Sequence, residues 1–337
     1  MGHELVSRPT HLLAGSLTKK IVAGVVAAVA VGTIPVASAG IELGEGLSVT
    51  GFVDQSFVYG KLDGTPSTKT YGIDQVETDF LYTGTSGVSA QVDIEYGENA
   101  SDLSASDVTF VEQAFVSKAF TDKFSVKVGR FLSYSGWETE EPTGLFQYSS
   151  TGYGKYFYGY YQQGISAAYN GGKFAVMGSL VNDVFGYADG PTERDTKKPG
   201  IEVGAAVMPV EGLIAKVFYM SDDKTDRDVI NFWTSYSTSG FTFAGEYNKA
   251  NYHDAGDGSG YLLMANYATG PFGITLRYHG YKIKDDPGAT IDKDSVITLS
   301  PSYKVGDKLL LVAEYRMDNF PGATDAKAFA LEALFTF

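Results

Sequence analysis

The chain has 337 residues and no Cys, and its 40 acidic and 26 basic residues give a formal net charge of -14. Its 44% of hydrophobic residues is too low for several helical membrane spans, because each span needs about 20 mostly apolar residues. Its 14% of aromatic residues argues against a disordered chain. The lack of Cys excludes disulfides, thiolate metal ligands and thiol nucleophiles, and the acidic balance makes nucleic acid an unsuitable partner.

Residues 1–39 have the three parts of a secretory signal peptide. A Lys-Lys pair at 19–20 precedes an apolar run over 21–31, and residues 37–39 read Ala-Ser-Ala. Such a small-x-small ending is typical of a cleavage site. We therefore expect cleavage after Ala39, with residues 40–337 exported as one domain. An uncleaved inner-membrane anchor is the alternative interpretation.

The rest of the chain alternates between apolar and polar residues with a period of two. In residues 87–97, for example, Val88 and Val92 alternate with Ser89 and Asp93. Successive side chains of a strand point to opposite faces, so one face is apolar and the other is polar. Pro301 cannot donate to a β-ladder and predicts a bulge or an early strand end. The alternation predicts sixteen strands, over residues 47–59, 73–84, 87–97, 107–119, 123–132, 162–170, 173–182, 199–208, 212–221, 227–238, 240–250, 259–269, 272–283, 293–304, 307–317 and 327–337.

The connections between these strands fall into two alternating classes. Short turns follow the even-numbered strands, and long polar loops follow the odd-numbered ones, such as 60–72, 183–198, 284–292 and 318–326. This alternation places all short turns at one rim and all long loops at the other. The layout is typical of an all-β, antiparallel, up-and-down transmembrane barrel of the bacterial outer membrane, with short periplasmic turns and long external loops.

A soluble β-sandwich is the alternative fold, because periodicity alone does not say which face lies outside. Two features favour the membrane barrel. The charged faces suit the wet interior of a wide sixteen-stranded barrel. Aromatic residues recur at strand ends, where they suit girdles at the two membrane interfaces. We therefore expect the apolar faces to contact outer-membrane lipid.

The last predicted strand alternates to the end of the chain, with Phe335 and Phe337 two residues apart. This ending resembles the recognition signal used in outer-membrane barrel assembly. The resemblance implies that the barrel assembly machinery is a partner.

The longest connection, residues 133–161, is the third long loop, and it is rich in Tyr and Phe. Connections of this length without structure of their own are usually functional. So many aromatic rings would be poorly solvated in water, so we expect loop three to fold against the lumen wall. An external loop with solvated acids is the alternative.

Residues Val128-Gly129-Arg130-Phe131 followed by Gly136-Trp137-Glu138 resemble outer-membrane porins, and more narrowly the OmpL-like β-barrel porin family. In general porins a third loop folds inward and narrows the channel, and porins form homotrimers. The resemblance therefore implies a constriction formed by loop three, and trimerisation of this chain. The implied constriction residues are Glu138, Glu140, Glu141, Tyr156 and Tyr160, and the implied opposing bases of the wall are Lys127, Arg130, Arg277 and Arg316.

Acidic residues gather on the polar faces of the early predicted strands, at Glu77, Asp79, Asp93, Glu95 and Glu112. Charged rings in a pore favour ions of the opposite sign. Together with the acidic balance of the chain, these lumen-wall residues predict a mild cation preference.

The sequence predicts no catalytic residues, no cofactor and no metal site. His253 and His279 are isolated, so they give no metal-ligand spacing. The acidic stretch 254–260 has an incomplete calcium-loop pattern, and no serine has a marked acid–base pair.

The sequence thus favours a passive channel for small hydrophilic solutes. Two alternatives remain open. One is a non-conducting barrel whose loops bind a surface partner. The other is a substrate-specific channel in which loop-three tyrosines stack on sugars.

Overall fold

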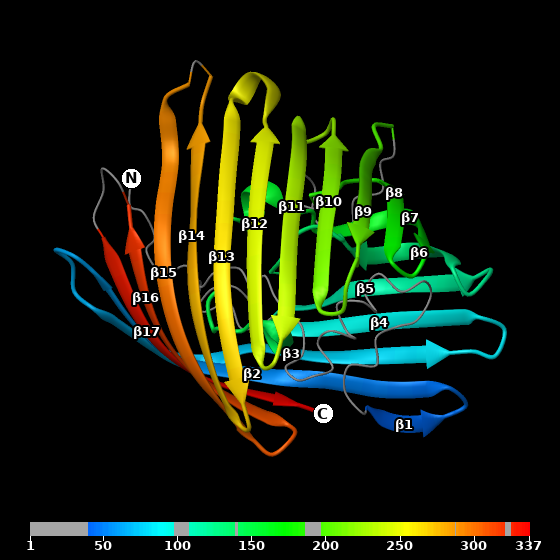
Figure 1. Ribbon diagram of the computed structural model, residues 1–337, viewed down its shortest axis with the longest axis horizontal. Helices are drawn as coiled ribbons and strands as arrows, with labels where there is room; N and C mark the ends of the chain where they lie inside the picture. Colours follow the sequence, from blue (N-terminus) through cyan, green and yellow to red (C-terminus); the bar gives the residue numbers. More distant parts are fainter. Residues whose placement is uncertain (1–39, 98–107, 139–140, 186–196, 287, 321–324) are drawn as a thin grey trace.

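The computed structural model describes residues 40–97, 108–138, 141–185, 197–286, 288–320 and 325–337. These residues form almost entirely β-strands in a single antiparallel sheet that closes on itself (Figure 1). None of the helices in the described residues has the length and hydrophobicity of a membrane-spanning helix. The predicted signal peptide, residues 1–39, lies outside the described residues.

Sixteen strands form the barrel wall, and each corresponds to one predicted segment, so the predicted fold is confirmed. Their bounds are β2 Leu47–Leu62, β3 Thr68–Thr83, β4 Val88–Gly97, β5 Val108–Ala119, β6 Phe124–Leu132, β7 Tyr161–Asn170, β8 Phe174–Val181, β9 Gly200–Val207, β10 Leu213–Asp222, β11 Arg227–Thr238, β12 Phe241–Asn251, β13 Asp257–Thr269, β14 Phe272–Lys284, β15 Thr290–Val305, β16 Leu309–Asn319 and β17 Ala326–Thr336. Each strand pairs with its chain neighbours, and β17 pairs with β2 to close the barrel.

A short additional strand, β1 (Ile41–Gly44), was not predicted, because four residues are too few to show a period of two. It pairs with the start of β2, over Leu47–Val49, beyond the end of the β17 ladder. Next to it, the backbone N–H of Phe337 donates to the Gly51 carbonyl at 3.0 Å. The Thr50 hydroxyl donates to the Phe337 carbonyl at 2.8 Å. The first and last strands of the wall are therefore joined at this end.

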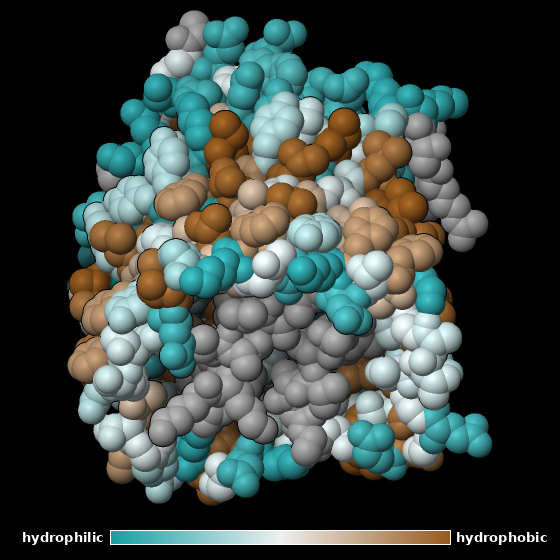
Figure 2. Space-filling model, turned by 45° about the vertical axis from the view of Figure 1, so that its right-hand side comes forward, coloured by the Kyte–Doolittle hydropathy of each residue, from teal (hydrophilic) through white to brown (hydrophobic). Residues whose placement is uncertain are grey.

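The alternation places polar side chains inside and apolar side chains outside. On β12, Phe243 and Tyr247 are exposed, whereas Thr242, Glu246 and Asn248 are buried. On β4, Ser89 and Asp93 are buried in the same way. The outer wall carries a band of hydrophobic side chains, with hydrophilic side chains gathered above it (Figure 2). The polar faces thus line the lumen.

Two β-bulges interrupt the alternation on the lumen side. On β3, Asp74 and Gln75 are both buried, where the register against β2 shifts. On β5, Glu112 is the extra residue opposite Asp93 and Ile94 of β4. A bulge adds one residue to a strand and turns consecutive side chains to one face. This explains the less regular alternation of the β5 sequence.

The structure corrects two details of the predicted wall. Pro301 neither ends β15 nor shifts its register, because its pairs with β14 and the pairs that flank it toward β16 stay in step. The loop predicted at 60–72 covers only residues 63–67, because β2 and β3 continue their ladder beyond the alternating segments. Strand pairing therefore extends further toward the long-loop rim than hydrophobic periodicity indicates.

Candidate functional site

Loop three, residues 133–160, connects β6 to β7, and its described residues, 133–138 and 141–160, lie inside the barrel. It contains two short helical turns, η1 (Pro142–Gly144) and α2 (Gly154–Phe157). Its hydrogen bonds reach side chains of β9, β11, β12, β14, β16 and β2. The loop therefore crosses the lumen and contacts most of the wall.

The carboxylate of Glu246 on β12 accepts hydrogen bonds from residues near both ends of loop three. It accepts hydrogen bonds from the Trp137 backbone N–H at 2.9 Å, from Asn231 at 2.6 Å and from the Tyr153 hydroxyl at 2.6 Å. The Tyr158 hydroxyl also donates to it. Four donors satisfy this buried carboxylate, as a buried charge requires.

The second anchor is an ion pair between Glu138 of the loop and Arg277 of β14. Their side chains are 2% and 0% exposed, and Arg277 Nη1 lies 2.6 Å from Glu138 Oε1. Arg277 also donates to the carbonyl oxygens of Ser149 at 2.6 Å and Ser150 at 3.3 Å. Thr151 donates its backbone N–H to the other Glu138 oxygen at 2.8 Å. This ion pair therefore joins two parts of loop three to each other and fixes both to β14.

An aromatic core packs α2 against strands β11 to β14. Tyr153, Phe157 and Tyr158 are buried there with wall residues such as Leu262 and Met264. The wall is shaped for them: a Cβ at Gly260 would lie 2.6 Å from the Phe157 ring. Glycine on this lumen face therefore makes room for a loop residue. This core explains why apolar residues occur on the lumen faces of β10, β11 and β13.

The five predicted wall acids lie together on β3, β4 and β5, and we name them the acid arc. Glu77 is paired directly across the strands with Glu95, and Asp79 with Asp93. Carboxylate oxygens of Glu77, Asp79 and Asp93 all lie within 4.8 Å of one another, close enough to share a cation. Glu112, turned inward by its bulge, completes the set. Like charges directly opposite each other disfavour a sheet, so the acid arc is not explained by stability.

Amide side chains donate to two members of the acid arc: Gln75 donates to Glu77 at 3.3 Å, and two glutamines donate to Asp93. Gln91 donates to Asp93 Oδ2 at 2.8 Å and Gln113 at 2.6 Å. The side-chain oxygen of Gln113 accepts a hydrogen bond from the backbone N–H of Leu132, the last residue before loop three, at 2.9 Å. The arc is therefore connected to the base of the loop.

The predicted bases of the wall have partners of different kinds. Lys127 lies over the rings of Phe131 and Tyr134, 4.6 and 4.5 Å from their centroids. Arg130 donates to the backbone carbonyl of Glu112 at 2.6 Å. Arg316 on β16 pairs with Asp318 at 2.5 Å and donates to the Ser150 carbonyl at 2.9 Å. Arg277 and Arg316 thus hold loop three rather than facing it across a gap.

The remaining predicted loop residues lie in three settings. Glu141 is half-buried. Its burial, together with the charges of Asp79, Asp93 and Glu112, raises its pKa well above the ordinary value. The Tyr156 hydroxyl donates to Asp292 of β15 at 2.5 Å. The Tyr160 ring packs on Tyr161 at 5.0 Å, and Glu140 lies outside the described residues. Of the loop acids in the described part, only Glu141 is close to the acid arc.

Sequence reasoning missed Glu246 and Glu202 as binding sites for the loop. Glu202 on β9 accepts from the Ser133 hydroxyl at 2.8 Å and from the Tyr134 backbone N–H at 3.0 Å. Both are single acids on otherwise neutral lumen faces. Nothing in the sequence around either acid indicates a contact with loop three, so the sequence held no signal for their role.

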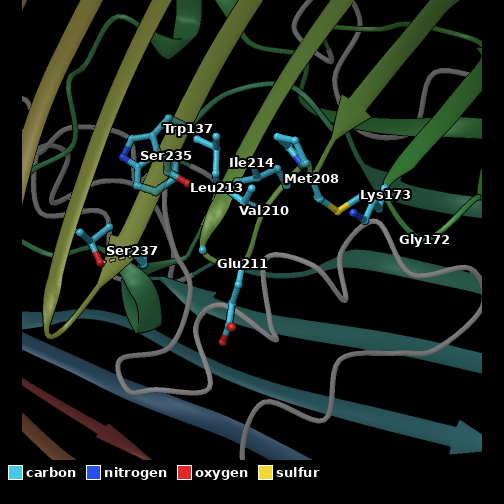
Figure 3. A pocket seen from close by; sticks show the side chains of 13 residues that line it. Trp137, Gly172, Lys173, Met208, Val210, Glu211, Leu213, Ile214, Ser235 and Ser237 are labelled. Atoms are coloured by element: carbon cyan, nitrogen blue, oxygen red, sulfur yellow. Dashed lines mark hydrogen bonds between the residues drawn. The ribbon is translucent and has the colours of Figure 1, made fainter.

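A pocket of about 310 Å³ lies between loop three and the short-turn rim (Figure 3). Trp137 lines it from the loop, and Met208, Leu213 and Ile214 line it from the strands and turn around β10. The Trp137 ring packs edge-on against Trp233 of β11, at 5.3 Å between centroids. The pocket is thus the short-turn side of the loop-three packing.

Comparison with known proteins gives a family and a fold. A family model described as Gram-negative porin matches residues 23–323. No match was found among curated protein sequences. Among solved structures, the chain is similar to an anion-selective porin from Comamonas acidovorans, at 16% identity and a TM-score of 0.65 over 86% of this chain and 99% of that one.

Two further solved structures have the same fold. OprB of Pseudomonas putida matches at 11% identity and a TM-score of 0.64, over 87% of this chain and 94% of that one. OmpT of Vibrio cholerae, an outer-membrane protein, matches at 13% identity and a TM-score of 0.61, over 88% of this chain and 100% of that one. At these identities, the likeness concerns the fold alone.

Proposed function

Because this chain belongs to the Gram-negative porin family and folds as a closed barrel, it is an outer-membrane channel protein, and we propose that it is a passive diffusion channel with a mild cation preference. The observation that carries this proposal is the position of the acid arc. Its five carboxylates face the lumen on three adjacent strands, beside Glu141 of loop three. Hydrated cations would be favoured along this side of the lumen.

In this proposal, loop three narrows the lumen and fixes the path of solutes. The packed side of the lumen, from β9 to β14, is filled by the aromatic core of the loop. Solutes therefore pass on the side of the acid arc, where Glu141 contributes a further carboxylate. The channel performs no chemistry and needs no catalytic residue or cofactor.

The sugar-channel alternative finds little support in loop three. The hydroxyls of Tyr153 and Tyr158 are bound to Glu246, and that of Tyr156 to Asp292. The rings therefore pack against the barrel wall and are not exposed along the lumen for stacking on a sugar. The second alternative, a surface-binding barrel without conductance, is separated by the experiment below.

The test is a planar-bilayer recording of the purified protein in a KCl gradient. We expect conductance steps and a reversal potential of the cation-selective sign. The triple variant E77Q/D79N/D93N should lose most of that preference. The matched control D63N/D223N/D254N removes three exposed acids of the long loops and should keep most of it. A chloride-selective wild type, or an equal loss in both variants, would overturn the assignment to the acid arc; absence of any step would overturn the channel itself.

Four finer points belong to the same proposal. We propose cleavage after Ala39, which mass spectrometry of the mature N-terminus would check by finding Gly40 first.

We propose a homotrimer, which light scattering in detergent would check. Phe335 and Phe337 are proposed to be read by the barrel assembly machinery, so F337A should lower the amount of assembled barrel. Placement in the OmpL-like group rests on residues 128–131 and 136–138.

A further inference from the structure

The pocket between loop three and the short-turn rim has mostly apolar walls (Figure 3). Trp137 lines it from the loop, and Met208 and Leu213 line it from the turn and strand around β10. Its volume of about 310 Å³ lies at the lower end of the range for sites that bind small molecules. The pocket therefore suits a ligand with a single aromatic ring.

Two polar side chains follow the pocket on the inward faces of β10 and β11. Lys216 is the next inward residue of β10 after Ile214, which lines the pocket. Trp233 has the corresponding position on β11, next to the pocket residue Ser235. Successive inward residues are about 7 Å apart along a strand. The pocket therefore ends close to Lys216 and Trp233.

The Lys216 ammonium group is buried, and no acid compensates its charge. The residue is 6% exposed. Its ammonium lies 4.7 Å from the centroid of the Trp233 ring, which is paired with it across the strands. Among the described residues, no salt bridge or hydrogen bond joins this ammonium to another group. A buried charge is costly unless it is paired, so a negatively charged ligand group beside Lys216 would remove this cost.

Other inward bases near loop three do have an acid. Arg277 pairs with Glu138, and Arg316 pairs with Asp318. Lys127 lies over aromatic rings as Lys216 does, but its charge interacts with the carboxylate of Glu202. Among these four bases, Lys216 alone lacks an acid in the part of the chain that the structure describes. The packing of loop three therefore does not account for its charge.

The indole N–H of Trp233 is a second buried donor at the same place. Trp233 is 4% exposed, and its Nε1 has no acceptor within the described residues. A buried indole N–H usually has a hydrogen-bond partner. A carboxylate carries a negative charge and two oxygens that accept hydrogen bonds. Lys216 and Trp233 therefore lack the same kind of partner, an anionic acceptor.

We propose that the pocket binds a small aromatic carboxylate, whose carboxylate group pairs with Lys216 and accepts a hydrogen bond from Trp233. Its ring packs against the apolar walls, between Trp137 and Ile214. A chloride ion would compensate the charge but would leave these walls without a partner. The site lies against β10 and β11, on the side of the lumen that loop three fills, so this inference goes beyond the proposed cation diffusion and does not depend on it.

The test uses the full mature chain, folded in a non-ionic detergent, with 3-phenylpropanoate as the probe. Trp137 and Trp233 are the two tryptophans of the chain, so the intrinsic fluorescence of the protein reports on this site. We expect a saturable change with a Kd of about 1 mM or lower, from the size of the probe. Two comparison compounds, 3-phenylpropanol without the charge and propanoate without the ring, should each bind at least about tenfold more weakly.

The decisive variant is K216M, which removes the ammonium group and keeps a side chain of similar length. It should bind 3-phenylpropanoate about 10- to 100-fold more weakly and 3-phenylpropanol as the wild type does. Because K216M removes a buried charge without an acid partner, its resistance to urea should equal or exceed that of the wild type. The matched control is K304M, which replaces a half-buried lysine on the inward row of β15 and should bind the probe within about twofold of the wild type.

The outcomes separate a binding site from a structural lysine. Unchanged affinity of K216M, an equal loss in K304M, or equal affinity of the wild type for 3-phenylpropanoate and its alcohol would overturn the carboxylate assignment. Lower urea resistance of K216M would show that Lys216 supports the fold through Trp233 instead. Absence of a saturable change in the wild type would overturn the site itself. If K216M does not fold, the three compounds on the wild type decide. Binding is measured without ion flow, so the result is independent of the channel proposal.

Discussion

The lumen wall has two sides in which the same residue types do different things. On the packed side, from β9 to β14, the acids Glu202 and Glu246 are each surrounded by donors from loop three. In the acid arc, Glu77 faces Glu95 and Asp79 faces Asp93 across the strands, and the amide donors at Glu77 and Asp93 come from the strands rather than from loop three. A carboxylate on a lumen face is therefore a structural anchor where the loop supplies donors, and a source of electrostatic potential where it does not.

The largest expected effect comes from breaking the ion pair that holds loop three on the packed side. The variant R277M leaves the buried Glu138 without its partner, which costs about 3–5 kcal/mol for a pair of this kind. We expect loop three to become accessible to protease, together with flickering single-channel currents. The double variant R277M/E138Q should recover much of the loss. Full protease resistance of R277M would contradict the role of this pair.

Removing one negative charge should have opposite signs on the two sides. E246Q replaces an oxygen that accepts from loop three with an amide donor, and should destabilise the barrel by about 1–3 kcal/mol. E77Q removes a carboxylate that faces Glu95, and should stabilise it by up to about 1 kcal/mol. Urea unfolding in detergent measures both. Destabilisation of similar size in both variants would remove the distinction between the two sides.

The packed side should also be sensitive to added volume. In G260V the new side chain would meet the Phe157 ring, which its Cβ alone would approach to 2.6 Å, and overpacking of this kind costs about 1–3 kcal/mol. The control is G245A on the outward face, where the nearest atom to a new Cβ, on Leu263, lies at 3.5 Å. We expect loss of stability in the urea experiment for G260V only. Equal behaviour of the two variants would argue against close packing of α2.

The smallest expected effect concerns pH and sharpens the description of the acid arc. Because the pKa of Glu141 is raised, this carboxyl becomes protonated and neutral at a higher pH than an ordinary glutamate as pH falls. Cation preference should therefore begin to decline above the ordinary range of about pH 4.3. A pH series of reversal potentials measures this decline. In E141Q the early part of the decline should be absent, and its persistence there would assign it to another group.

Most of the fold was predictable because a membrane barrel repeats one simple constraint. Each strand must present an apolar face to lipid, so period-two alternation marked all sixteen strands of the wall, and turn residues separated the two rims. The alternation of apolar and polar residues could not predict structural features that have no period of two. The strand β1 is too short, the bulges at Asp74 and Glu112 insert a residue, and backbone pairing extends β2 and β3 beyond the alternating residues.

The candidate site was predictable in composition but not in pairing. The residues of the acid arc could be placed on the lumen face because each lies on the polar face of a predicted strand, and the three strands follow one another in the sequence. The anchors of loop three could not, because Glu138 and Arg277 are 139 residues apart in the sequence and no local rule connects them. Glu246 likewise looked like any other polar lumen residue.

The contact between Phe337 and Gly51 has a consequence for biogenesis. Every other ladder of the wall joins segments that are adjacent in the sequence, so hairpins can form one after another as local events. The β17–β2 ladder alone unites segments from the two extremes of the cylinder wall, and it brings together the most distant parts of the chain. Until this ladder forms, β2 and β17 are unpaired edge strands that can pair with strands of other chains. Closure is therefore the step of insertion at which assistance from another protein matters most.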